Sequence, residues 1–274
     1  MLDFKSSLLR AASILASALA TAFLVGACAQ NTTTQTVNPQ DSRTAPESAE
    51  PERRAALRLE LAGLYFSNGQ FDTALEETRL ALAARPDLGG AYNLRGLIYA
   101  AIGDDKQADE NFARSLAINP RDVDAMHNRG WFLCQRNRFD EADRLFDQAL
   151  AQPQYRDAPR TLMAQGVCLA RAGKLAEAEK KLLRTYEIDA GNPTAALNLS
   201  EVLYRRGEFE RARFYIRRVN TREDMSNAQT LWLALRIENR IGNRNGVEEY
   251  ARQLRSRFPQ SPEAIALERG RLDD

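Results

Sequence analysis

A motif that returns about every 34 residues is the feature that most limits what this 274-residue chain can fold into. Six apolar-periodic segments each end in glycine or asparagine, and alanine follows five residues later in five of the six. These turn positions lie 34, 34, 36, 34 and 35 residues apart: Gly69, Gly103, Asn137, Gly173, Gly207 and Gly242. Glycine adopts the left-handed conformation that ends many helices. The fixed period indicates stacked helical units rather than an irregular bundle around one core.

The unit at residues 91–120 shows which kind of repeat this is. Its pattern resembles the tetratricopeptide repeat, a helix-turn-helix of about 34 residues. Six of its residues match marked slots of that repeat: Tyr92, Gly96, Tyr99, Ala108, Phe112 and Pro120. The resemblance implies an all-α fold, a right-handed superhelical solenoid of six helix-turn-helix repeats within residues 51–274. We place the repeats at about 55–88, 89–122, 123–156, 159–192, 193–226 and 228–261, with a short C-terminal capping helix after them.

The N-terminus carries the pattern of an exported lipoprotein. Lys5 and Arg10 precede an alanine-rich apolar stretch of about 15 residues, which is typical of a signal peptide over residues 1–27 and short for a spanning helix. The sequence LVGAC at residues 24–28 resembles the bacterial lipobox, which implies cleavage before Cys28 and acylation of that cysteine. With Ala29 next, sorting in such bacteria implies the periplasmic face of the outer membrane. Two alternatives remain, an A-x-A cleavage site at residues 27–29 and a retained membrane anchor.

A polar segment separates Cys28 from the repeats. Residues 29–50 contain no aromatic residue and little aliphatic content, so they cannot bury enough surface to offset the entropy of ordering. We therefore expect residues 28–50 to form a flexible tether. A coil of this length spans about 25 Å, which would let the repeat domain search for a partner while it stays attached to lipid.

Charge and composition exclude several classes of function. The chain has 38 basic and 37 acidic residues, a net charge of +1, so it lacks the overall basic field of a nucleic-acid-binding protein. His127 is the single histidine, and three cysteines are too few for a four-cysteine zinc site. No nucleophile is accompanied by a base in any recognisable motif. We therefore expect a protein that is not an enzyme and that uses no cofactor, metal or small-molecule substrate.

The first helices of the repeats are the expected binding surface, because in tetratricopeptide proteins they line the inner face of the superhelix. Residues three or seven positions apart on these helices point the same way. In the N-terminal repeats they are unusually apolar, whereas Arg160, Arg171, Glu201 and Arg205 make the later ones charged. An exposed apolar groove typically binds a helix or an extended peptide. The alternative is that Phe66 and Trp131 are core residues. The residues predicted to contact a partner are Leu59, Phe66, Asn93, Leu97, His127 and Trp131.

Two cysteines occupy similar places in the first helices of neighbouring repeats. Cys134 and Cys168 are one repeat period apart, and an exported chain enters an oxidising compartment in which such a pair can form a disulfide. The alternative is a pair of buried free thiols.

A second resemblance covers the signal, the tether, the repeat number and both of these cysteines. Residues 128–134, NRGWFLC, together with GVC at residues 166–168, are similar to the PilF/PilW family of type IV pilus lipoproteins. Membership would imply a pilotin, which binds the pilus secretin subunit and promotes its outer-membrane localisation, multimerisation or stability. The alternative is a general periplasmic scaffold lipoprotein, such as a barrel-assembly component or a protease adaptor.

Overall fold

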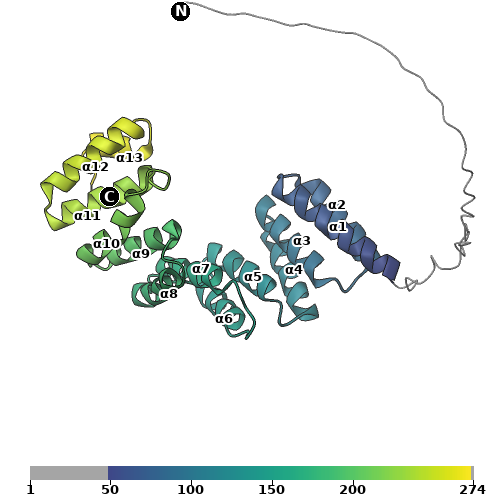
Figure 1. The fold of residues 1–274 in the computed structure, drawn as a ribbon. Coiled ribbons are helices and arrows are strands. Elements are labelled where there is room, and N and C mark those ends of the chain that lie inside the picture. The colour runs from purple at the N-terminus through teal and green to yellow at the C-terminus, as the bar shows by residue number, and fades with distance from the viewer. Residues whose placement is uncertain (1–48, 273–274) are drawn as a thin grey trace, which may run out of the picture. The chain divides into compact units, whose positions relative to one another are not determined.

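A computed structural model of the protein describes residues 49–272, and over this range the chain forms 13 helices and no strand. Residues 1–48, with the predicted signal peptide, Cys28 and most of the predicted tether, lie outside the described residues. Twelve helices form six consecutive pairs (Figure 1). The pairs are α1 (Ala49–Ser67) and α2 (Phe71–Ala84), α3 (Gly89–Ile102) and α4 (Asp105–Ile118), α5 (Val123–Gln135) and α6 (Phe139–Leu150), α7 (Ala158–Arg171) and α8 (Leu175–Ile188), α9 (Pro193–Arg205) and α10 (Phe209–Asn220), and α11 (Ala228–Ile241) and α12 (Arg244–Arg257). The predicted all-helical repeat solenoid is confirmed.

Each pair turns at the glycine or asparagine that the repeat places there. Gly103 ends α3 with a φ of 84°, in the left-handed region that glycine adopts without a steric penalty. Asn137 adopts the same conformation with a φ of 59°, which asparagine tolerates better than most residues do. A polar side chain caps two of the six helices that follow these turns, α4 and α12. The Asp104 carboxylate, for example, accepts a hydrogen bond of 3.0 Å from the backbone N–H of Gln107 at the start of α4.

Inside the second, third and fourth pairs, the two helices approach each other at a glycine in the first helix. A Cβ atom added to Gly96 would lie 2.6 Å from the ring of Phe112, and one added to Gly166 would lie 2.6 Å from Leu182 Cγ. Phe112 and Leu182 are completely buried. The large side chain of the second helix therefore fills the space that a side chain on the first helix would need.

Successive pairs stack through contacts between the second helix of one pair and the first helix of the next. At the junction of α4 and α5, the rings of Phe112 and Phe132 lie 5.6 Å apart. The first helices also contact one another, since α3 touches α5, α5 touches α7 and α7 touches α9. They therefore form one continuous surface, and the predicted partner-binding residues belong to these helices.

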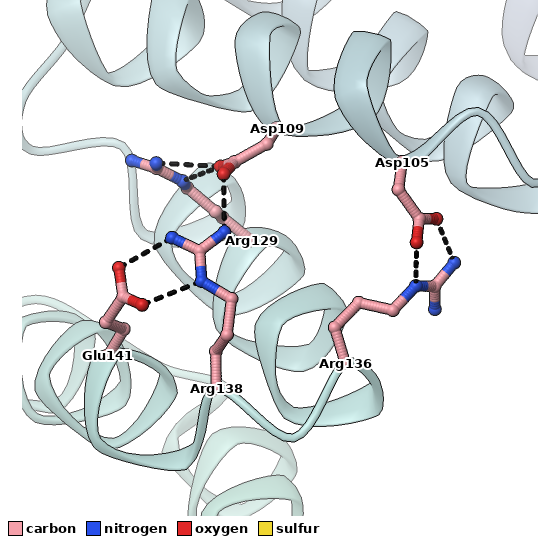
Figure 2. Close-up of polar contacts among 6 residues, drawn as sticks. All are labelled: Asp105, Asp109, Arg129, Arg136, Arg138 and Glu141. Carbon is pink, nitrogen blue, oxygen red and sulfur yellow. Dashed lines mark hydrogen bonds and ion pairs between the residues drawn. The ribbon is translucent and has the colours of Figure 1, made fainter.

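A network of ion pairs joins the second and third helix pairs (Figure 2). Asp109 on α4 accepts hydrogen bonds from Arg129 on α5 at 2.8 Å and from Arg138 at 2.6 Å, and Arg138 also pairs with Glu141. Burial alone would raise the pKa of Asp109, but the hydrogen bonds from the two arginines hold that pKa below its ordinary value. Because one carboxylate of the second pair binds two arginines of the third pair, the network helps to fix how the two pairs stack.

A disulfide and an insertion distinguish the junction of the third and fourth pairs. Cys134 of α5 is bonded to Cys168 of α7, with their Cα atoms 5.7 Å apart. The connection from α6 to α7 spans residues 151–157 and includes the two residues that lengthen this repeat. The disulfide therefore joins the first helices of two pairs that are connected by the longer loop.

The C-terminal end of the stack is closed by α13 (Pro262–Glu268). Ala264 of this helix packs with Leu231 of α11 and Leu254 of α12 in a buried cluster. Within residues 49–272, no helix has both the length and the hydropathy needed to cross a membrane.

Candidate functional site

An apolar hollow of about 390 Å³ opens on the surface formed by α5, α7 and α9. Trp131 of α5 and Met163, Ala164 and Val167 of α7 supply its apolar lining. Thr194 and Asn198 of α9 line one side, and His127 and Arg160 complete it. Trp131 and Ala164 pack at their inner sides against the buried cluster that contains Phe132 and Cys168.

Helical periodicity places these side chains on one surface. Trp131 and Val167 each lie six residues before the turn residue of their repeat, and His127 and Met163 each lie ten residues before it. Positions four apart on a helix lie one above the other. The contact between α5 and α7 then brings the two sets together.

His127 lies in the wall of the hollow and is only 7% exposed. Its Nδ1 atom is 2.8 Å from Thr161 Oγ1, and the hydroxyl of Tyr155 in the 151–157 loop is 2.6 Å from the same oxygen. The partner contact predicted for His127 stays a prediction. In the structure, this residue forms a mostly buried part of the wall and presents little surface.

The surroundings of His127 favour the neutral imidazole. Burial is the main cause that lowers its pKa from 6.5 to about 4, and the charge of Arg160 lowers it further, whereas Asp124 opposes the shift. His127 therefore takes up a proton near pH 6.5 in the unfolded chain but only near pH 4 in the folded chain. Because protons bind preferentially to the unfolded chain in this range, the free energy of unfolding is highest above pH 6.5 and falls as the pH is lowered toward 4.

Lowering the pH from 7.5 to 5 should therefore reduce the free energy of unfolding by about 2 kcal/mol through His127 alone. Urea unfolding at both pH values measures the loss. The variant His127→Asn keeps a polar group near Thr161 but cannot titrate, so its pH dependence over this range should be flatter by that amount. Equal dependence in the two proteins would contradict the assignment.

Arg160 is the charged group at the edge of the hollow, and its contacts are long. Its guanidinium lies 3.5 Å from Asp124, 3.9 Å from Asp157 and 3.3 Å from the side-chain oxygen of Asn128, and the side chain is 44% exposed. Exposed ion pairs at such distances contribute little to stability. The cation is therefore available to an acidic group on a bound polypeptide.

The predicted residues of the first two pairs lie apart from the lining of this hollow. Phe66 packs on Phe71 with ring centroids 6.0 Å apart, and Leu59 approaches Gly90 of α3. Leu97 packs against the buried cluster of the second and third pairs. Asn93 accepts a hydrogen bond of 3.2 Å from the side chain of Asn128. Of the six predicted residues, His127 and Trp131 line the hollow, and its centre lies further along the stack than expected.

Sequence reasoning missed Met163, Ala164 and Val167 because it gave most weight to the charged residues of the later repeats. Two of those arginines do not line the hollow. Arg205 donates a hydrogen bond of 2.9 Å to the backbone carbonyl of Ala170, and Arg171 approaches Asn137 at 3.5 Å. A usable signal was present, since Val167 holds the same place relative to its turn glycine as Trp131 does relative to Asn137.

The described residues contain no group of three or more His, Cys, Asp or Glu side chains that could hold a metal ion. The hollow offers apolar surface, two polar side chains of α9 and one cation. This combination suits the binding of a polypeptide segment.

Comparison with known proteins agrees with this architecture. Four family models, each described as a tetratricopeptide repeat, match residues 89–122, 111–144, 129–193 and 169–234. The chain belongs to the tetratricopeptide-repeat family. Together, the matched ranges run from the second helix pair into the sixth, and they include every residue that lines the hollow.

Within that family, the chain is similar to PilF and PilW. It is 26% identical over 211 residues to the type IV pilus assembly protein PilF of Pseudomonas aeruginosa, a match that covers 77% of this chain and 82% of PilF. The crystal structure of PilW, a widely conserved type IV pilus biogenesis factor, superposes with a TM-score of 0.73 at 29% identity, covering 78% of this chain and 97% of PilW. The structure of Pseudomonas aeruginosa PilF shares the fold, with a TM-score of 0.69 at 23% identity over 81% of this chain and 99% of PilF.

Proposed function

We propose that this tetratricopeptide-repeat protein is a pilotin, an outer-membrane lipoprotein that binds the type IV pilus secretin and promotes its localisation, multimerisation or stability. The likeness to PilF and PilW supports a part in type IV pilus biogenesis. The observation that carries the binding role is the apolar hollow on α5, α7 and α9. Nothing in this function requires catalysis by the chain.

The proposed mechanism has two parts, binding of a secretin segment in the hollow and attachment of the chain to the membrane. An apolar side chain of the secretin segment fills the hollow between Trp131 and Val167, while Arg160 pairs with a carboxylate beside it. Acylated Cys28 holds the chain at the periplasmic face of the outer membrane. Because the partner is then held near the bilayer, its subunits meet at a raised local concentration, which favours multimers.

Acidic substitutions in the hollow test whether the hollow binds the secretin segment. Val167→Glu and Met163→Glu should each reduce the heat-resistant secretin multimer at least fivefold, because a carboxylate in an apolar site must lose its hydration. The matched control is Ile102→Glu on α3, whose side chain is 48% exposed and does not line the hollow. Immunoblots of unheated outer membranes measure the multimer, and circular dichroism checks that each variant is folded.

The variant Leu97→Glu distinguishes between two candidate binding sites, the hollow and the groove predicted in the N-terminal repeats. Loss of multimers with Leu97→Glu and normal levels with Val167→Glu would move the binding site to the second pair. Normal multimer levels with all the charged variants would reject binding of the secretin at the hollow. Pull-down of barrel-assembly components or a protease in place of the secretin would favour the scaffold alternative.

A further inference from the structure

The first helices of the last three pairs carry an excess of basic residues. α7, α9 and α11 contain five arginines: Arg160, Arg171, Arg205, Arg236 and Arg240. Of their two glutamates, Glu238 is 1% exposed and lies 3.7 Å from Arg213 and Arg217 of α10. Glu201 is partly exposed. In α1, α3 and α5, by contrast, five basic residues stand against four acidic ones. Positive charge is therefore concentrated on the later part of the surface that the first helices form.

Three of these arginines occupy one position of the repeat. Arg171, Arg205 and Arg240 each lie two residues before the turn glycine of their repeat, and all three are exposed. Because α7 contacts α9 and α9 contacts α11, this position recurs side by side on neighbouring helices. We call these three side chains the arginine row.

The arginine row has no carboxylate partner within residues 49–272. Its three side chains contact instead a side-chain amide, a backbone carbonyl and an aromatic ring, those of Asn137, Ala170 and Phe209. Acidic residues near the same turns are occupied by other cations. Asp140 lies 2.9 Å from Lys174. Glu208 lies 3.0 Å from Arg206. The charge of the row is therefore not neutralised within the described part of the chain.

The row continues the surface of the apolar hollow. Met163, Val167 and Arg171 follow one another at intervals of four residues, so one side of α7 carries first the apolar lining and then the cation. Four residues of a helix span about 6 Å along its axis. A polypeptide whose apolar side chain fills the hollow would therefore reach Arg171 after about two extended residues.

The spacing of the row fits carboxylates on an extended chain. Helices in contact have axes about 8–10 Å apart, which sets the separation of neighbouring arginines in the row. An extended chain covers this distance in about three residues. A guanidinium can bind both oxygens of one carboxylate, which favours acidic side chains over neutral polar ones. Aspartate or glutamate at about every third residue would therefore match the row.

The neighbouring hollow favours a polypeptide over other anions. A nucleic acid supplies regularly spaced phosphates but no aliphatic side chain to fill an apolar hollow beside them, whereas a polypeptide supplies both kinds of group in one chain. We propose that the arginine row binds an acidic polypeptide segment whose carboxylates lie about three residues apart. The inference rests on the proposed function in one respect, that this segment belongs to the polypeptide held in the hollow.

Binding of a labelled peptide of ten glutamates, followed by fluorescence anisotropy at low salt, tests the row. The protein is the whole mature chain with Cys28→Ser, which removes the site of acylation. Arg171→Gln, Arg205→Gln and Arg240→Gln combined should weaken binding at least tenfold, because each exposed ion pair contributes a factor of up to about five. A peptide of ten glutamines should not bind.

The matched control changes the net charge equally at three exposed arginines of second helices, by Arg79→Gln, Arg184→Gln and Arg252→Gln. It should bind the glutamate peptide nearly as the parent does, because these positions lie outside the row.

Two further variants separate charge from structure. Lysine at all three row positions keeps the charge and should keep most of the binding. Glu201→Gln should strengthen binding by a factor of up to about five, because Glu201 lies one turn before Arg205 and repels the carboxylates of the peptide.

Equal binding by the glutamine variant of the row and the matched control would overturn the proposal, and so would failure of the parent to bind the glutamate peptide. Loss of binding in a lysine variant that circular dichroism shows to be folded would also overturn it. Binding of phosphatidylglycerol vesicles or a single-stranded oligonucleotide through the row, without binding of the glutamate peptide, would overturn it by assigning the row to phosphates.

The proposed function is judged separately by Val167→Glu and the secretin multimer. Reduced multimers with a row that does not bind the glutamate peptide would reject the row alone. Normal multimers with row-dependent peptide binding would reject the hollow as the secretin site and leave the row in place.

Discussion

Loss of the disulfide between Cys134 and Cys168 should lower the free energy of unfolding by about 4 kcal/mol. The bond closes a loop with a sequence separation of 34 residues. By the chain-entropy estimate, a loop of that size restricts the unfolded chain by about this amount. The effect should concentrate in the third and fourth pairs, because a repeat protein is stabilised by interactions between neighbouring units.

Urea unfolding of the oxidised protein, the reduced protein and the variant Cys134→Ser with Cys168→Ser measures this contribution. The reduced protein and the double variant should unfold at similar, lower urea concentrations. Addition of reductant to the double variant is the control and should change nothing. Identical midpoints for oxidised and reduced protein would show that the link does not stabilise the fold.

Alanine in place of Gly96 or Gly166, where two paired helices approach closely, should also lower the free energy of unfolding. Gly96→Ala and Gly166→Ala should each destabilise the protein by about 2 kcal/mol, and by about 4 kcal/mol together, because the new methyl groups would lie 2.6 Å from atoms of the buried side chains of Phe112 and Leu182. The two sites lie in different helix pairs, so their effects should add.

Gly63→Ala is the control that separates packing from helix propensity. Gly63 lies within α1 and has no atom within 4 Å of an added Cβ. The same substitution there should stabilise the protein by up to about 1 kcal/mol, because alanine favours helix. Thermal unfolding of the three single variants is sufficient, and a stabilised Gly96→Ala protein would contradict the packing described for α3 and α4.

The fold was predictable from the sequence because the turn and packing residues recur at the same spacing in successive repeats. Gly103 recurs as Gly207 and Gly242, and each of them has a positive φ of 78° to 84°. Asn137 broke the glycine pattern but kept the position, which was enough to place a turn there. Small and large residues at fixed distances from the turn then implied which helices pack together.

The charged contacts between repeats were not predictable in the same way. Glu238 interrupts the pattern of the sixth repeat, and in the structure it is 1% exposed, accepts a hydrogen bond of 2.8 Å from Asn243 and lies 3.7 Å from Arg213 and Arg217. Its partners come from outside its own helix. Such pairing depends on side-chain conformations across a junction, which a repeat pattern does not specify.

The position of the hollow was missed for a related reason. Exposed charge on Arg160 suggested a polar surface in the fourth pair, but Met163 and Val167 follow it on the same helix and line the hollow together with Trp131. The equal distances of Trp131 and Val167 from their turn residues offered a signal, but the hollow itself depends on how α5 and α7 are set against each other in space.

The covalent bond between α5 and α7 also bears on recognition. These two helices provide most of the lining of the hollow, and they are joined close to Val167. A receptor cavity whose walls are already fixed loses less conformational freedom when a ligand enters, so more of the contact energy remains as affinity. It also needs no slow rearrangement before docking, which favours rapid binding of a partner.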